Sequence, residues 1–139
     1  MSVELNHIII PVKDKWAAAR FLAHVLGLEV GREWARFVPV RTGNGVTLDF
    51  AEWKEVRPMH CAFLVSDAEF DAALERVRNA GIKFYAEFDG TGPGTTNRLY
   101  GGRGFYFNDP DGHMFEIITR PYGAEPERWI DGAAAKWTG

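Results

Sequence analysis

The sequence predicts a mixed α+β fold made of two copies of one unit, and an internal repeat is the observation that predicts it. Residues 5–12 and 58–65 are short apolar runs that carry a histidine at the same place, His7 and His60, 53 residues apart. Each run is followed by a helix signal and then by segments with strand character. We therefore expect two βαβββ modules.

A helix is predicted directly after each of the two apolar runs. Asp14 precedes the first predicted helix, residues 15–26. Ser66 begins the second, and Glu69 completes a capping box in which side chains satisfy the free amides of the first helical turn. Glycines suited to the left-handed position that follows a helix end the two segments, Gly27 and Gly81.

Three strands are predicted after each helix. They span 28–34, 36–40 and 46–51 in the first module, and 83–87, 104–108 and 113–120 in the second. Turns rich in Gly, Asn and Asp precede the last strand of each module, as in hairpins. The second module is longer, and most of its additional residues fall in the Gly-rich segment 88–103, a predicted surface loop.

The chain length fits one domain. We expect a single domain over 1–139, with the first module at about 4–53, the second at about 57–121 and a C-terminal tail at 122–139. A short helix is predicted in the tail, around 127–137.

Composition excludes several classes of function. Sixteen Lys and Arg against nineteen Asp and Glu give a net charge of −3, so the basic excess of a general nucleic-acid binder is missing. Apolar stretches are too short to cross a bilayer, and no signal-peptide pattern is present. A single cysteine, Cys61, suits a reducing compartment. We expect a cytoplasmic protein with neither a nucleic-acid nor a membrane partner.

Four polar residues are the candidates for chemistry. His7 and His60 match in the repeat, and aligning the turn glycines of the last strands places Asp49 against Glu116. A carboxylate between apolar neighbours on one strand face is rarely buried without a partner. Imidazole nitrogen and carboxylate oxygen together suit a borderline divalent ion. The pattern predicts His7, His60 and Glu116 as metal ligands, with Asp49 as a fourth ligand, a base or a solvated strand residue.

The chain also resembles the vicinal oxygen chelate superfamily, which includes glyoxalase I, extradiol dioxygenases, fosfomycin-resistance thiol transferases and bleomycin-binding proteins. The resemblance covers about 4–121. It rests on Leu5-Asn6-His7-Ile8, on the segment 59–66 and, most specifically, on the segment 105–116. It implies a glyoxalase/bleomycin resistance/dihydroxybiphenyl dioxygenase fold, in which two modules form a cup-shaped mixed sheet around a divalent metal.

The resemblance also implies which residues are functional. The family pattern of ligands falls on His7, His60 and Glu116, and Asp49 falls where glyoxalase I carries a further Glu. We therefore expect Glu116 and Asp49 to take part in catalysis, at Fe, Mn, Ni, Co or Zn. The implied substrate is a small oxygenated molecule held at the metal, and family members often pair as homodimers.

The reaction stays open at this point, because one scaffold hosts many chemistries. A lyase, isomerase or dioxygenase reaction is compatible with the ligand set. The alternative is a metal-free protein that sequesters a small molecule or an antibiotic, and a third hypothesis is a degenerate module that serves only in assembly. Extradiol cleavage is disfavoured because residues 97–99 stand where that signature requires a histidine, and His113 faces away from Glu116.

Other residues near the predicted pocket are weaker candidates. Tyr106 shares the face of Glu116 if the hairpin register is regular. Arg98, Tyr100 and Arg103 could bind an anion or be solvated loop residues, and the loop 88–103 is expected to cover the pocket.

Overall fold

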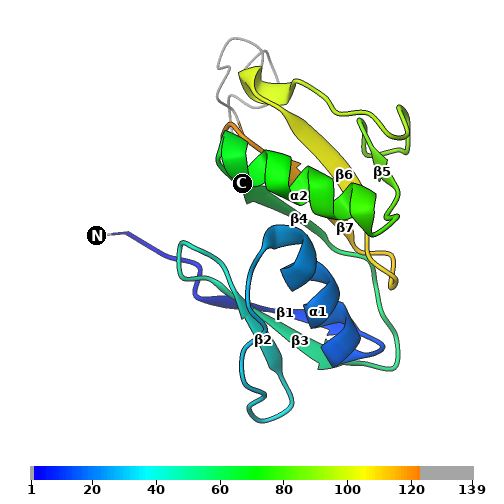
Figure 1. The fold of residues 1–139 in the computed structure, drawn as a ribbon. Coiled ribbons are helices and arrows are strands. Elements are labelled where there is room, and N and C mark those ends of the chain that lie inside the picture. Colours follow the sequence, from blue (N-terminus) through cyan, green and yellow to red (C-terminus); the bar gives the residue numbers. More distant parts are fainter. Residues whose placement is uncertain (1, 123–139) are drawn as a thin grey trace, which may run out of the picture.

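The computed structural model describes residues 2–122, which form two β-sheets that each carry one helix (Figure 1). Within this range, no helix combines the length and the apolar character needed to cross a membrane. The helix predicted around 127–137 and nearly all of the predicted tail lie outside the described residues.

The first module contributes one helix and one mixed sheet. Its elements are β1 (His7–Val12), α1 (Lys15–Leu26), β2 (Val38–Arg41) and β3 (Thr47–Glu52). In the described chain the strand order is β1-β3-β2, with β1 parallel to β3 and β2 antiparallel to it.

The second module repeats this arrangement with one more short strand. Its elements are β4 (His60–Leu64), α2 (Asp67–Asn79), β5 (Phe84–Tyr85), a 3-10 turn (Leu99–Gly101), β6 (Gly104–Asn108) and β7 (Met114–Ile118). The strand order over the described residues is β4-β7-β6-β5, and β4 runs parallel to β7. The predicted α+β fold class is therefore confirmed.

Local sequence explains where the helices begin and end. The Asp14 side chain accepts a hydrogen bond from the Ala17 amide at 3.0 Å, and α1 ends at Gly27 with φ +70°. At the start of α2, the Ser66 hydroxyl accepts from the Glu69 amide, and the Glu69 carboxylate accepts from the Ser66 amide. The predicted capping box is present and sets the beginning of α2.

The strand predicted over 28–34 is wrong. In its place, Val30 and Trp34 each form an isolated bridge, to Val40 and Phe37. Directly after this segment, Ala35 takes a left-handed conformation with φ +50°, and the backbones of Trp34 and Phe37 hydrogen-bond each other across the turn. The other predicted strands are present, with that at 83–87 reduced to β5.

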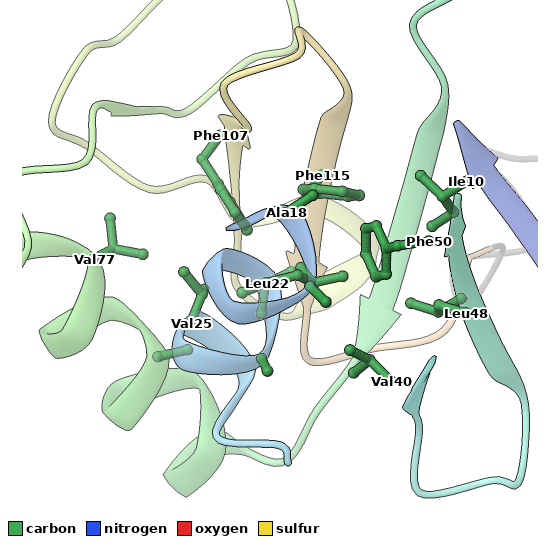
Figure 2. Close-up of a cluster of buried hydrophobic side chains, with 14 of the residues drawn as sticks. Ile10, Ala18, Leu22, Val25, Val40, Leu48, Phe50, Val77, Phe107 and Phe115 are labelled. Atoms are coloured by element: carbon green, nitrogen blue, oxygen red, sulfur yellow. The ribbon is translucent and has the colours of Figure 1, made fainter. Parts of the chain in front are cut away.

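One apolar core joins the two modules. This core includes Leu22 of α1, Phe50 of the first sheet, and Phe107 and Phe115 of the second, while Val25 of α1 lies on the side toward Val77 of α2 (Figure 2). The α1 and α2 helices also contact each other, and the Arg76 guanidinium donates to the Val25 carbonyl at 3.0 Å. Between residues 2 and 122 the modules therefore pack through helices and core side chains, while their sheets share no strand pairing.

Candidate metal centre

The second module brings two of the predicted ligands together. β4 and β7 are neighbours, and their register sets Ala62, two residues after His60, opposite Glu116. The His60 Nε2 atom lies 3.0 Å from Glu116 Oε1. The His60 side chain is 49% exposed, whereas the Glu116 side chain is only 7% exposed. An accessible imidazole therefore lies over a buried carboxylate.

The second oxygen of Glu116 is the feature that most resembles a ligand. Glu116 Oε2 is buried and has no hydrogen-bond partner. A buried carboxylate oxygen without a donor is costly, since the charge has lost its water and gained no compensating group. A cation beside His60 and Glu116 would supply that compensation, so these residues fit a divalent ion.

Tyr106 is a neighbour of this carboxylate. It lies directly opposite Glu116 in the β6–β7 register, close enough for the Glu116 carboxylate to act on its hydroxyl. Burial raises the pKa of Tyr106, and the negative charge of Glu116 raises it further. The Tyr106 ring also stacks near the His60 ring, at 6.2 Å between centroids. The position is the one that strand alternation predicted for a regular hairpin.

Tyr100, a weaker sequence candidate for binding an anion, is a neighbour of the pair. Burial raises the pKa of its hydroxyl, and the charge of Glu116 adds to the effect. Tyr100 has φ +60°, a left-handed conformation that costs a non-glycine residue about 1–3 kcal/mol, and such strain tends to occur near functional sites. Its ring meets Tyr122 edge-on at 5.2 Å. Nothing in the sequence around Tyr100 indicates this conformation.

The first module holds the other two predicted ligands in the same register. Asp49 lies opposite Ile9, two residues after His7, just as Glu116 lies opposite Ala62. Asp49 is 2% exposed, and its Oδ1 atom is buried without a hydrogen-bond partner. His7 is exposed, and its ring hydrogen-bonds Asn6 at 2.8 Å. The repeat therefore places an unpartnered buried carboxylate oxygen in each module.

The four predicted residues do not meet within one chain. His60 and Glu116 form one half-site on the second sheet, and His7 and Asp49 lie on the first. Across the described residues, no group of three or more His, Cys, Asp and Glu side chains is placed to hold a metal.

Three further residues with polar or reactive side chains lie outside this pair, in contacts that stabilise the fold. Arg103 pairs with Asp67 at 3.1 Å and Asp71 at 2.8 Å and lies over the Phe70 ring at 4.3 Å, so it joins β6 to α2. Cys61 is half-buried, and burial raises the pKa of its thiol. His113 is fully buried and lies directly before β7.

Comparisons with known proteins agree with this fold. Residues 4–117 match the family model described as the Glyoxalase/Bleomycin resistance protein/Dioxygenase superfamily. The metallothiol transferase FosB of Shouchella clausii (strain KSM-K16) is 30% identical over 83% of this chain and 79% of its own. The glutathione transferase FosA of Serratia marcescens is 28% identical over 84% and 81%. The structure of Oxidase ChaP-H2 is 49% identical, with a TM-score of 0.86 over 89% of this chain and 98% of that one.

Proposed function

Because the chain belongs to the Glyoxalase/Bleomycin resistance protein/Dioxygenase superfamily, we propose that it is a divalent-metal-dependent enzyme acting on a small oxygenated molecule. The observation that carries the proposal is the unpartnered Oε2 of Glu116, buried next to the accessible ring of His60. The name of the relative FosB, a metallothiol transferase, also supports a metal.

We infer further that two copies of the chain complete the ligand set. His60 and Glu116 of one copy would meet His7 of the other, with Asp49 as a fourth ligand or as a base. In the described chain, β1 and β4 each pair with a neighbour on one side only, so each leaves a row of backbone groups open. Exposed apolar residues flank these edges, Ile9 on β1 and Leu64 on β4.

Each residue has a distinct role in this proposal. When bound, the metal would hold substrate oxygens and stabilise negative charge that develops on them. Tyr106 would support the Glu116 carboxylate from the opposite position on β6. Ile9 and Leu64 lie on the same strand faces as the ligands and would offer apolar contact to the substrate's carbon skeleton. The donors are nitrogen and oxygen only, a set that Fe, Mn, Ni, Co and Zn all accept.

Among reactions, oxidation of the bound molecule is the best supported. The similarity to Oxidase ChaP-H2, 49% identical over 98% of that chain, exceeds the 28% and 30% identity to FosA and FosB. Thiol transfer is the second candidate, favoured by those two relatives. A substrate panel with and without dioxygen or added thiol separates the two.

Metal content tests the proposal. The unstripped protein should carry about one divalent ion per chain, and His7→Ala, His60→Ala and Glu116→Gln should each remove it with an unchanged circular dichroism spectrum. His24→Ala, at an exposed position on α1, is the matched control and should keep the metal. If the unstripped protein holds no metal and binds none of the five ions, the proposal fails.

Mixing two variants tests whether the site is shared. His7→Ala and His60→Ala proteins, unfolded and refolded together, should recover part of the bound metal, because a mixed pair contains one intact set. No recovery of bound metal would overturn the shared site. Ligand binding that neither a chelator nor His60→Ala changes would instead support the metal-free sequestration protein.

A further inference from the structure

His113 uses both of its ring nitrogens to connect segments that are far apart in the sequence. The Met59 amide donates to His113 Nδ1 at 2.9 Å, and His113 Nε2 lies 2.6 Å from the Pro11 carbonyl oxygen. The side chain is fully buried. One imidazole therefore links Met59, directly before β4 in the second module, to Pro11, near the end of β1 in the first module.

These two partners determine the protonation state of the ring. A backbone amide can only donate, so Nδ1 must be the unprotonated acceptor. A carbonyl can only accept, so Nε2 must carry the proton. The neutral Nε2–H tautomer satisfies both contacts, and neither a doubly protonated ring nor the other tautomer does.

The contact with Met59 acts on the backbone that carries His60. The Met59 carbonyl accepts from the Met114 amide at 2.8 Å, so both backbone groups of Met59 are held by residues at the start of β7. His60 follows directly and is the accessible member of the half-site. Its ring direction therefore depends on how Met59 is held.

His113 is itself held firmly in place. Its amide donates to Asp109 Oδ1 at 2.8 Å, and its carbonyl accepts from the Asp109 amide at 3.0 Å. The turn before β7 therefore fixes the backbone of His113 and with it the position of the ring. On the other side, Pro11 has no amide proton, and its carbonyl is the group it offers to His113.

We propose that His113 is a positioning residue of the metal centre: it fixes the backbone before His60 against β1 of the same chain and never contacts the metal. This inference rests on the proposed function, because it assigns His113 to the same site. When a residue that orients a metal ligand without contacting the metal is replaced, metal affinity typically falls about 10- to 100-fold.

Two substitutions separate the two hydrogen bonds. In His113→Asn, the side-chain oxygen stands where Nδ1 was and can accept from Met59. In His113→Gln, the side-chain amide reaches toward Pro11 and can donate to its carbonyl, with no acceptor for Met59. We expect His113→Asn to keep near-normal affinity for Zn²⁺, whereas the Zn²⁺ affinity of His113→Gln should fall about 10-fold or more. Each variant has lost one contact, so both should be less stable than the wild type.

Zn²⁺ affinity is measured by competition with a chromogenic chelator, and thermal unfolding is recorded for each protein. His24→Asn and His24→Gln, at the exposed site on α1, are matched controls and should leave the affinity unchanged. Equal affinity of the two His113 variants would overturn the inference. A wild type that binds no metal would overturn the proposed function as well, so the two failures are distinguishable.

Nitrogen-15 NMR of the wild type keeps the inference testable if the variants do not fold. His113 Nδ1 should have the chemical shift of an unprotonated nitrogen and Nε2 that of a protonated one, and the Met59 amide should resist hydrogen exchange. Adding Zn²⁺ should shift the His113 Nδ1 and Met59 amide signals. A protonated Nδ1, or signals that Zn²⁺ leaves in place, would contradict the proposal.

Discussion

His60 Nε2 lies 3.0 Å from Glu116 Oε1, although the two residues are 56 positions apart in the sequence. Parallel pairing of β4 with β7 brings them together, and the remaining oxygen of Glu116 is buried without a partner. The pair is the part of the candidate metal centre that one chain assembles by itself.

Tyr106→Phe should weaken metal binding by about 10- to 100-fold, because it removes a polar hydroxyl beside the proposed ligand Glu116. A chelator competition titration measures the loss. Tyr85→Phe makes the same change on the neighbouring strand β5 and should have no effect. Unchanged affinity in Tyr106→Phe would show that the hydroxyl does not support the ligand.

Tyr106 should also report metal binding through its own titration. Burial and the charge of Glu116 raise its pKa, so a cation that neutralises Glu116 should bring that pKa down toward its ordinary value of 10. Ultraviolet absorbance of tyrosinate, followed against pH with and without Zn²⁺, measures the change. Tyr106→Phe identifies which part of the signal belongs to this residue. A curve that Zn²⁺ does not alter would place the ion away from Glu116.

Glu69→Ala should lower the free energy of unfolding at neutral pH. In acid, the difference between the variant and the wild type should disappear. The hydrogen bonds with Ser66 lower the pKa of Glu69 below its ordinary value of 4.5. A lowered carboxyl pKa contributes stability above the unfolded value, and this is lost as the pH falls through the folded value. Urea unfolding at several pH values tests it. Glu75→Ala, at an exposed position on the same helix, is the control. It should change the free energy of unfolding less, and by a similar amount at each pH.

Arg103→Ala should destabilise the protein by about 1 kcal/mol, chiefly through lost contact with the Phe70 ring, since exposed ion pairs contribute little. Arg98→Ala, at an exposed position in the loop before β6, should change stability much less. Urea unfolding at low and high salt separates the screened ionic part from the ring contact. Equal effects of the two variants would contradict the role given to Arg103.

Phe115→Ala should cost about 3–5 kcal/mol, because the ring is fully buried in the core that both modules share. We expect the loss to affect the whole described fold in one cooperative transition. Thermal unfolding followed by Trp fluorescence and by circular dichroism should give coincident curves. Two separate transitions would mean that the modules unfold independently.

Much of the fold was predictable because the signals are local. The bounds of α1 depend on Asp14 and Gly27, and the beginning of α2 depends on a capping box within four residues. The equivalence of Asp49 and Glu116 followed from aligning two turns, and the strand registers bear it out. Where a local rule decided the structure, the sequence was sufficient.

The remaining features depend on contacts between distant residues. The left-handed turn at Ala35, directly after the segment predicted as a strand, carries no glycine or asparagine signal. The strained Tyr100 is held by its packing, and the bond between His113 and Pro11 spans 102 positions. Whether the four predicted ligands meet is likewise a question of packing, which residue spacing does not determine.

Because the two half-sites are separate, metal binding and activity should depend on the protein concentration. A chain alone offers His60 and Glu116 on one sheet and His7 and Asp49 on another, and the described residues do not join them. On the proposed assembly, dilution below the dissociation constant of the pair would release metal from folded protein. Activity per chain would then fall with dilution, while the helices and sheets of each chain stayed intact.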